Sequence, residues 1–359
     1  MPFKRIAYVL NVFPKLSETF IAGELAELIA RGVEVRALSL RLPKDEPHHP
    51  IVERAGLLTH MCYDASQFKT VLRDFQPQLI HAHFAREATA TARELADELD
   101  VPFTFTAHRY DIYDKAPSDF AARAAAAAAL ITVSHANAQY IATTFGVPLS
   151  HMHIIPCGVD TDCFAPSGLP ALEGPPLIVC VARLNRVKNQ ELLLRACARL
   201  KAFGIQFRCV LVGDGPTRHT LLDEVAALGL ESSVELAGAA NQAEVLQWLQ
   251  LATVAVLSSH SEGMPVCLME AAACGLPAVA MAVSGVPELI EDGITGFVIP
   301  PGDDAALAMA LSRILGDKDL AIRMGKAARL RALERFSVGL QVDHLLDLWT
   351  HILQQELVS

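Results

Sequence analysis

The fold is decided by the stretch LIVCVARLNRVKNQELLLRACARLKAFGIQFRCVLVGDGP, residues 177–216. Its apolar run at 177–184 predicts a buried strand, a helix-patterned segment follows, and a second apolar run at 207–212 predicts another strand. A strand, a helix and a second strand form a βαβ unit, whose two strands are parallel. The stretch therefore predicts an α/β protein built on parallel sheets.

The same alternation of strands and helices continues in both directions from this stretch. Downstream, strands are expected at 233–237, 253–257 and 277–281, and a last helix at about 332–352. Upstream, strands are expected at 5–11, 33–40, 78–83, 102–106, 130–134 and 152–155. Helices are expected between them at 18–31, 87–99, 117–129 and 135–145.

The chain divides at a segment rich in proline and glycine, FAPSGLPALEGPP at 164–176, which is typical of a linker between domains. A length of 359 residues also suits two domains of roughly 150 residues each. We expect a first Rossmann-like domain over 1–165 and a second over 166–335. The helix within 336–359 is expected to return toward the first domain. Two such domains facing each other across a cleft are the simplest assembly.

Composition excludes several classes of protein. With 52% hydrophobic and 19% charged residues the chain is not intrinsically disordered, and a net charge of −10 disfavours a nucleic-acid partner. Eight scattered cysteines with no C-x-x-C pair indicate reduced thiols. No signal peptide or membrane-spanning segment is evident, so a cytoplasmic location is expected.

Two glutamates stand out in SSHSEGMPVCLMEAAACGLP, residues 258–277. Glu262 follows an expected strand, and Pro265 is a natural early residue for the helix that carries Glu270. Both carboxylates would lie where parallel sheets bind ligands. Alternatively, Glu262 is an ordinary helix-start acid and Glu270 an exposed helical residue. The apolar neighbours of Glu270 argue against that alternative.

Cations and glycines follow the strands of the 177–216 stretch. Arg183 and Lys188 stand where a strand ends and a helix begins, a place that the helix dipole makes favourable for anions. A bound phosphate would explain both cations, although a solvated pair is the alternative. Gly213 and Gly215 follow the next strand, but Arg218 replaces the third glycine of a dinucleotide fingerprint, so a tight turn is the simpler interpretation.

Histidines mark the first half of the chain. His108 comes directly after an expected strand, where its ring could enter a cleft, and a structural role is the alternative. His81 and His83 alternate on a strand and therefore share one face. Because no carboxylate or cysteine stands at a useful spacing from them, we predict no metal site.

The ordered set of motifs resembles glycosyltransferase family 4. The matching segments are TAHRYD around His108, ITVSH around Ser134, IPCGVD at 155–160, VARLNRVKN at 181–189, VGDGP at 212–216, the Glu262–Glu270 pair, and SGVPELIEDGITGFVIPPGD at 284–303. The N-terminal segment FPKLSETFIAGELAELIARG at 13–32 is similar to the subgroup that builds bacterial exopolysaccharides such as colanic acid.

The resemblance implies the GT-B architecture, with two Rossmann-like domains facing across a cleft. It also implies transfer of a hexose, with retention of configuration, from a UDP- or GDP-sugar to a saccharide acceptor. Arg183 and Lys188 would stabilise the diphosphate, so that neither a metal nor any other cofactor is needed. Glu270 would hold the ribose, while His108 and Glu262 would line the sugar subsite. The remaining implied contacts with sugar, phosphate or acceptor are Gly263, Met264, Pro265, Gly213, Ser134 and Glu18.

By its subgroup, the acceptor is expected to be a lipid-linked oligosaccharide at the inner face of the cytoplasmic membrane, and any membrane contact would be peripheral. Two departures affect the site. Lys15, Ser17 and Glu18 stand where the family often has a glycine pair, and Arg109 follows His108 where many members have glycine. A sugar-nucleotide epimerase of the same fold and a non-catalytic nucleotide-sugar-binding subunit are the alternatives.

Overall fold

The computed structural model describes residues 3–43, 49–168 and 174–356, which form two compact units. The first unit contains Met1–Gly158 together with Val338–Ser359, and the second contains Val159–Ser337. The chain thus divides at 158/159 and not at 165/166, and residues 159–165 belong to the second unit. Residues 169–173 of the predicted linker lie outside the described residues. Each unit is considered by itself.

The first unit alternates strands and helices along the chain and takes its last helix from the far end of the sequence. Its elements are β1 (Arg5–Val12), α1 (Thr19–Ala30), β2 (Glu34–Arg41), α2 (Pro50–Arg54), η1 (Leu57–His60), β3 (Met61–Cys62), η2 (Ala65–Gln67), α3 (Phe68–Phe75), β4 (Leu79–His83), α4 (Glu87–Leu99), β5 (Phe103–Ala107), η3 (Tyr110–Asp114), α5 (Phe120–Ala126), β6 (Ala129–Thr132), α6 (His135–Phe145), η4 (Leu149–His151), β7 (Met152–Ile154) and α14 (Val338–Glu356).

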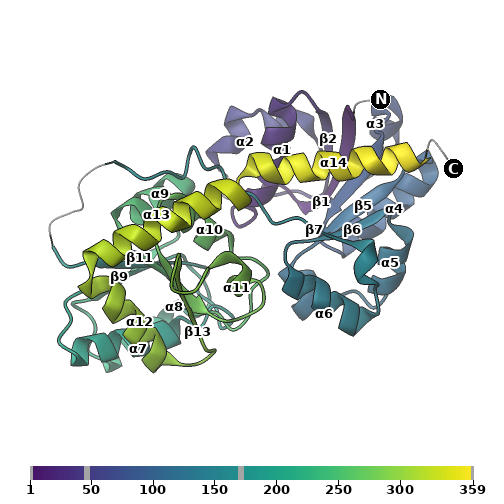
Figure 1. The fold of residues 1–359 in the computed structure, drawn as a ribbon. Coiled ribbons are helices and arrows are strands. Elements are labelled where there is room, and N and C mark those ends of the chain that lie inside the picture. Colours follow the sequence, from purple (N-terminus) through teal and green to yellow (C-terminus); the bar gives the residue numbers. More distant parts are fainter. Residues whose placement is uncertain (1–2, 44–48, 169–173, 357–359) are drawn as a thin grey trace. The chain divides into compact units, whose positions relative to one another are not determined.

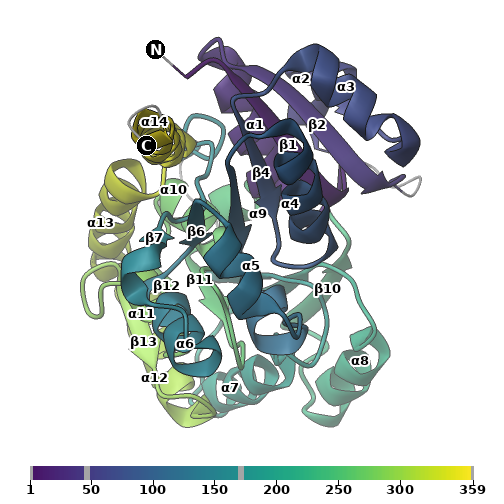
Figure 2. The same cartoon turned by 90° about the vertical axis from the view of Figure 1, so that its right-hand side faces the viewer.

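Seven parallel strands form the sheet of the first unit, in the order β3-β2-β1-β4-β5-β6-β7. Alternate residues of β1 belong to two different cores, because successive side chains of a strand point to opposite faces. Ala7 and Val9 pack with α3 to α6, whereas Ile6, Tyr8 and Leu10 pack with α1 and α14. Figure 1 shows the yellow α14 alongside α1, and Figure 2 shows α4 against β1 and β4.

The second unit is a continuous segment with the same alternation. Its elements are β8 (Leu177–Val181), α7 (Gln190–Ala202), β9 (Arg208–Val212), α8 (Arg218–Ala227), β10 (Val234–Gly238), α9 (Gln242–Leu251), β11 (Val254–Leu257), α10 (Val266–Ala273), β12 (Ala278–Met281), α11 (Val286–Leu289), β13 (Gly296–Ile299), α12 (Asp304–Gly316) and α13 (Lys318–Arg335).

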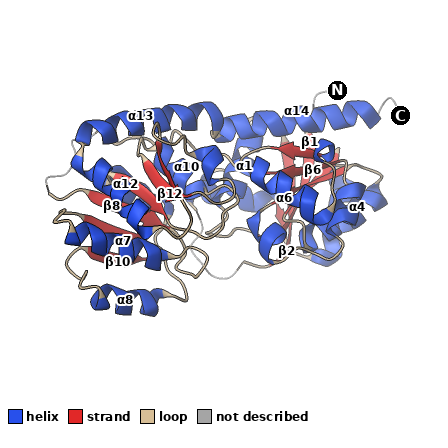
Figure 3. Cartoon of the chain, turned by 60° about the horizontal axis from the view of Figure 1, so that its bottom comes forward, coloured by secondary structure: helices blue, strands red, loops and turns tan. Residues whose placement is uncertain are grey.

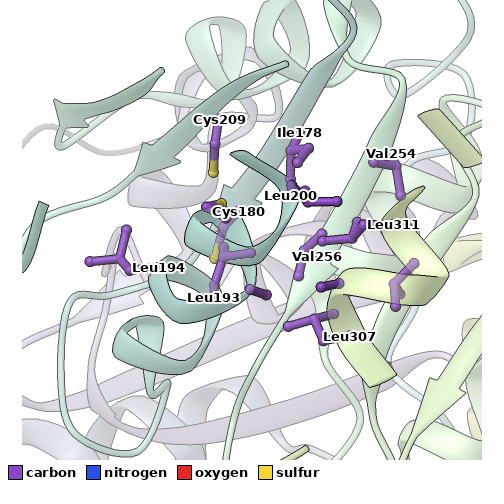
Figure 4. Packing of buried hydrophobic residues seen from close by; sticks show 14 of the residues in the cluster. Ile178, Cys180, Leu193, Leu194, Leu200, Cys209, Val254, Val256, Leu307 and Leu311 are labelled. Carbon is purple, nitrogen blue, oxygen red and sulfur yellow. The ribbon is translucent and has the colours of Figure 1, made fainter. Parts of the chain in front are cut away.

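Six parallel strands form the second sheet, in the order β10-β9-β8-β11-β12-β13. Figure 3 shows helices on both sides of the red strands in each unit. Leucines of α7 and α12 pack on alternate residues of β8 and β11, such as Ile178 and Val256, to form a closed core (Figure 4). Both units therefore have the predicted parallel α/β sheets.

Three local differences from the predicted elements have simple causes. The alanine-rich run at 121–129 was expected to lie in one helix, but α5 ends at Ala126 and Ala129 begins β6. The amide of Ala128 donates to the carbonyl of Phe103 instead of continuing the helix. The helix expected over 332–352 is broken at Phe336 and Ser337, where the chain passes between units. The short strands β3 and β13 were not predicted.

The order of each sheet reverses between two central strands, β1 and β4 in the first unit and β8 and β11 in the second. Ligands of such sheets bind at the carboxyl ends of the strands beside this switch point. The predicted site residues follow strands at this edge. Among the described helices, none combines the length and the apolar character needed to cross a membrane.

Candidate functional site

The centre of the candidate site in the second unit is an ion pair between Lys188 and Glu262. Lys188 follows β8 and Glu262 follows β11, the two strands at the switch point. The ammonium Nζ donates to Oε1 of Glu262 at 2.5 Å, and the side chains are 22% and 6% exposed. The structure thus joins two residues that the sequence placed in separate motifs.

Hydrogen bonds between the two loops hold this pair in place. The amide of Lys188 donates to the Asn185 side chain at 3.1 Å, which closes a turn before α7. The hydroxyl of Ser258 donates to the carbonyl oxygen of Asn189 at 2.8 Å, and the amide of His260 donates to the carbonyl oxygen of Val187 at 2.8 Å. The lysine is therefore positioned before any ligand arrives.

The charges of the site are only partly compensated. Burial alone would lower the pKa of Lys188, but the charge and hydrogen bond of Glu262, together with the neighbouring Cys267 and Cys180, raise it, so the lysine stays protonated. Arg183 follows the same strand and is exposed, and the described residues offer its guanidinium no carboxylate within ion-pair distance. The β8 loop therefore keeps uncompensated positive charge, which suits a phosphate.

Glu270 lies in α10 with its carboxyl group buried and without a cation. The residue is 8% exposed, and no described side chain forms an ion pair with it. Burial raises its pKa from the usual 4.5 to about 8. It is therefore not the exposed helical residue of the alternative interpretation. A buried carboxyl with no protein donor is available to hydroxyl groups of a ligand.

The glycines of the VGDGP motif have a packing role. Gly213 has a φ of +138°, and a Cβ there would lie 2.1 Å from the carbonyl oxygen of Ala182. A Cβ at Gly215 would lie 2.2 Å from the carbonyl oxygen of Leu184. The close approach of the β8 and β9 loops requires glycine at both positions.

The segment from Gly263 to Pro265 is buried between the two glutamates. Gly263 accepts a hydrogen bond from the amide of Gly285 at 3.1 Å, and Met264 is 7% exposed. Helix α10 begins at Val266, so Pro265 occupies the N-cap position and not the first turn.

A polar cavity of about 370 Å³ lies near these loops. Asn185, Arg186, Gln190, Thr217 and His260 contribute to its lining, which includes none of the predicted site residues. The side-chain oxygens of Gln190 and Thr217 are buried and have no hydrogen-bond partner. Sequence reasoning gave no signal for this cavity.

His108 lies in the first unit, directly after β5, and is 8% exposed. Its ring contacts those of Phe20 and Phe84, with centroids 4.8 and 4.7 Å away. Its Nε2 lies 3.0 Å from Nδ1 of His83. Burial, with His83 next, lowers its pKa well below the usual 6.5, so the ring is neutral.

Buried polar side chains continue from His108 across the face of the sheet that α1 and α14 cover. His81 and His83 lie on that face, as their alternation predicts, and Glu24 of α1 joins them. The expectation that no carboxylate accompanies the two histidines was therefore wrong. The signal was present in the sequence: Glu24 lies three residues after Ile21 and four before Leu28, on the apolar face of the helix.

The loop after His108 is fixed by two acidic residues that sequence reasoning did not select. Asp111 is buried and accepts from the amides of Ala85 and His108 at 2.5 and 2.9 Å. Burial raises its pKa to about 7. Asp114 binds the Arg109 guanidinium at 2.6 Å and closes the π-helical turn η3. Arg109 therefore points into a local ion pair.

Ser134 and Glu18 make local contacts. Ser134 is the N-cap of α6, and its hydroxyl accepts from the amide of Asn137 at 3.2 Å. Glu18 precedes α1 and pairs with Lys15 at 2.5 Å. Both follow strands at the carboxyl edge, but each side chain already has a protein partner.

Two family descriptions match consecutive parts of the chain. Residues 17–163 match "Glycosyltransferase Family 4", and residues 166–331 match "Glycosyl transferases group 1". The chain belongs to glycosyltransferase family 4. The motifs that carried the resemblance thus identified the family.

Curated relatives of this family 4 chain include two proteins named for polysaccharide biosynthesis. The amylovoran biosynthesis glycosyltransferase AmsK of Erwinia amylovora is 33% identical over 205 residues, which cover 55% of this chain and 50% of the relative. The putative colanic acid biosynthesis glycosyltransferase WcaL of Escherichia coli K12 is 36% identical over 173 residues, covering 46% and 43%. The chain thus spans about half the length of the curated relatives it matches.

A solved structure extends the likeness to the whole fold. Anabaena HepE in complex with UDP-glucose matches with a TM-score of 0.75 and 20% identity, over 96% of this chain and 99% of that chain. Together with the two parallel sheets, this match identifies the GT-B fold that the resemblance implied.

Proposed function

We propose that this chain is a retaining glycosyltransferase that transfers a hexose from a nucleoside-diphosphate sugar to a saccharide acceptor. The observation that carries the proposal is the group of residues that follows β8 and β11 at the switch point. It combines the Lys188–Glu262 pair with an exposed arginine and a buried glutamate that have no described ion-pair partner. The names of AmsK and WcaL support a role in exopolysaccharide or related surface-glycan biosynthesis. The UDP-glucose bound by HepE supports a nucleotide-sugar donor.

Arg183 and Lys188 would bind the diphosphate. An ammonium group has three donors, so Lys188 can keep its bond to Glu262 and still donate to a phosphate oxygen. The negative charge on the diphosphate grows as the glycosidic bond breaks, and prepositioned cations stabilise that charge. We propose that these side chains take the place of a divalent cation.

Glu270 would bind the ribose of the nucleotide. The two hydroxyl groups of a ribose can both donate to one carboxylate. These bonds would supply the donors that the buried carboxyl lacks in the protein. Backbone groups of Gly263, Met264 and Pro265 would lie beside the sugar or phosphate, with Glu262 at the sugar subsite.

His108 of the first unit would contact the hexose near the reacting carbon. The acceptor would be a lipid-linked oligosaccharide at the inner face of the cytoplasmic membrane, reached from the cytoplasm by peripheral contact. Names of relatives in exopolysaccharide pathways support this part of the proposal.

The first test is calorimetric binding of UDP-glucose, UDP-galactose and GDP-mannose in excess chelator. Glu270→Ala removes the proposed ribose contact, and Glu231→Ala, at an exposed glutamate of the same unit, is the matched control. We expect one donor to bind the wild type and the control but not Glu270→Ala. Binding that requires a divalent cation would contradict the proposed role of Arg183 and Lys188.

Turnover then separates transfer from the alternatives. The donor that binds is incubated with lipid-linked oligosaccharide fractions, and the anomeric configuration of the product is read by NMR. An α-linked product from an α-linked donor supports retention. Conversion of the donor to its epimer would indicate an epimerase, and binding without any reaction would indicate a nucleotide-sugar-binding subunit.

A further inference from the structure

Glu24 lies at the end of a buried hydrogen-bond chain in the first unit. Its Oε1 accepts from the hydroxyl of Tyr8 at 2.5 Å, and its Oε2 accepts from the side-chain amide of Gln341 at 2.6 Å. The orientation of that amide is settled because its oxygen accepts from the backbone amide of Gly158 at 2.7 Å. Nε2 of His83 lies 3.2 Å from the same carboxyl group. The side chains of Tyr8, Gln341 and His83 are thus partners of one carboxylate.

The protons of this group can be placed from its partners. Both carboxylate oxygens of Glu24 accept from other donors, so the hydrogen at its contact with His83 is the ring hydrogen on Nε2 of His83. Burial and the neighbouring Glu24 raise the pKa of Tyr8 well above its usual 10, which keeps the phenol as a donor. With its single ring proton on Nε2, His83 carries a lone pair on Nδ1.

This placement determines the tautomer of His108. Nε2 of His108 lies 3.0 Å from Nδ1 of His83, and two lone pairs do not face each other at that distance. The neutral ring of His108 therefore carries its proton on Nε2. Its Nδ1 has no hydrogen-bond partner among the described residues.

The backbone and the ring faces of His108 are held as well. Its amide donates to Asp111, and its ring meets that of His83 edge to edge through the Nε2–Nδ1 contact, with only 25° between the two ring planes. Phe20 and Phe84 cover other parts of the ring. Because so many contacts fix the ring, the direction of its free nitrogen is fixed too.

We infer that Glu24 and His83 are positioning residues that hold His108 as the Nε2–H tautomer, so that its Nδ1 accepts a hydrogen bond from a hydroxyl group of the sugar. The identity of that ligand rests on the proposed function. The tautomer does not, because it follows from the contacts within the first unit. The chain runs from the sugar hydroxyl through His108 and His83 to the carboxylate of Glu24.

A metal ion held by Glu24, His81 and His83 is the competing interpretation, because atoms of these residues lie within 4.8 Å of one another. However, both ring nitrogens of His81 already lie within hydrogen-bond distance of Thr104 and Thr106, at 2.9 and 3.2 Å. Both carboxylate oxygens of Glu24 have donors as well. The contacts therefore favour the hydrogen-bond chain.

The test is the ring tautomer of His108, read by long-range ¹H–¹⁵N correlation spectra of the full chain labelled with ¹⁵N-histidine. His83→Gln and His108→Gln assign the two signals. We expect the Nε2–H tautomer for both rings in the wild type, and a shift of the His108 signal in Glu24→Gln. His81→Gln is the matched control, since it replaces a buried histidine of β4 outside the chain and should leave the His108 tautomer unchanged.

Kinetics supply the second measurement, using whichever of UDP-glucose, UDP-galactose and GDP-mannose binds in calorimetry. Glu24→Gln should lower kcat about 10- to 100-fold, the size of effect known for carboxylates that orient metal-bound histidines, with KM changed less than about threefold. A higher KM with an unchanged kcat in Glu24→Gln would contradict the positioning role. If no nucleotide sugar reacts with the wild type, the proposed function fails, and the spectra still test the tautomer.

Three results would overturn the inference. They are an Nδ1–H tautomer of His108 in the wild type, an unchanged His108 signal in Glu24→Gln, and a stoichiometric metal in the purified wild type that is lost in Glu24→Gln. Should Glu24→Gln fail to fold, the wild-type spectrum decides the tautomer by itself. Tyr8→Phe, which removes one donor to Glu24, then replaces it as the perturbing variant.

Discussion

The two units each bury a polar cluster at the carboxyl edge of a parallel sheet, but they satisfy these clusters differently. In the first unit, the carboxylate of Glu24 and the ring nitrogens of His81 and His83 all have partners within the protein. In the second unit, Lys188 has Glu262, whereas the buried Glu270 has no described partner. Glu24, His81 and His83 are thus satisfied without a ligand, whereas Glu270 is not.

This difference separates positioning from binding. A buried polar network with every member satisfied is rigid and holds a side chain in one orientation. A buried carboxyl without donors is costly to the folded protein, so its presence indicates a ligand that supplies them. Substitutions in the two clusters should therefore affect stability and activity in different ways.

Lys188→Ala should break the second cluster most severely. The rate of transfer should fall about 100- to 1000-fold, as it does when a prepositioned hydrogen-bond donor is removed from an active site. Glu262 would be left buried without its cation, which should lower the free energy of unfolding by about 2 to 3 kcal/mol. The double variant Lys188→Met/Glu262→Gln should recover the stability but not the activity. Initial rates and urea unfolding measure both; full activity in Lys188→Ala would refute the site assignment.

Glu270→Gln should weaken donor binding and stabilise the protein at high pH. Between the usual pKa of 4.5 and the folded value of about 8, the folded protein holds a proton that the unfolded chain has lost. The free energy of unfolding therefore falls as pH rises through this window, and the full cost is present above about pH 8. Glu270→Gln removes that cost.

Urea unfolding at pH 4.5 and pH 9 checks this sign. The variant should match the wild type at pH 4.5 and be more stable by about 2 to 4 kcal/mol at pH 9, while donor affinity falls about 10- to 100-fold. Glu231→Gln, at an exposed position, should change neither quantity. A variant that is less stable than the wild type at pH 9 would show that Glu270 has a partner in the protein.

Donor binding should release protons near pH 7. The free Glu270 is largely protonated there, and two hydroxyl donors favour its ionised form. Calorimetry in buffers of different ionisation enthalpy should therefore give a fraction of a proton released per donor bound. Release that persists in Glu270→Gln would assign the proton to another group.

Ser134→Ala should have the smallest effect. Because the hydroxyl is the N-cap of α6, its loss should cost about 1 kcal/mol of stability. Transfer should change less than about threefold, since the side chain already has a protein partner. A loss of 100-fold in kcat/KM at unchanged stability would restore Ser134 as a ligand contact.

The sequence predicted the parts of the fold that depend on local patterns. Continuous apolar runs such as 207–212 marked the central strands, because buried parallel strands have no polar face. The edge strands β3 and β13 are short and were missed. The break between α13 and α14 was also missed: helix-forming residues lie on both sides of Ser337, and the passage between units, which is tertiary, ends the first helix.

The site was predictable where one motif carries its own chemistry, and not where residues meet through the fold. Arg183, Lys188 and Glu262 could be selected by their places after strands, but the pairing of Lys188 with Glu262 joins positions 74 residues apart. Glu24 was overlooked because its partners come from β1, β4 and α14. Only the sheet order and the return of α14 bring those elements together.

That return of α14 sets the order in which the molecule can be completed during synthesis. All of the second unit is synthesised before Gln341 and Trp349 are made, although Trp349 is fully buried in the first unit. Domains fold as units while the chain emerges. The unit that is started first is therefore finished last, and the nascent chain exposes the apolar α14-facing side of its first sheet until translation has passed residue 349.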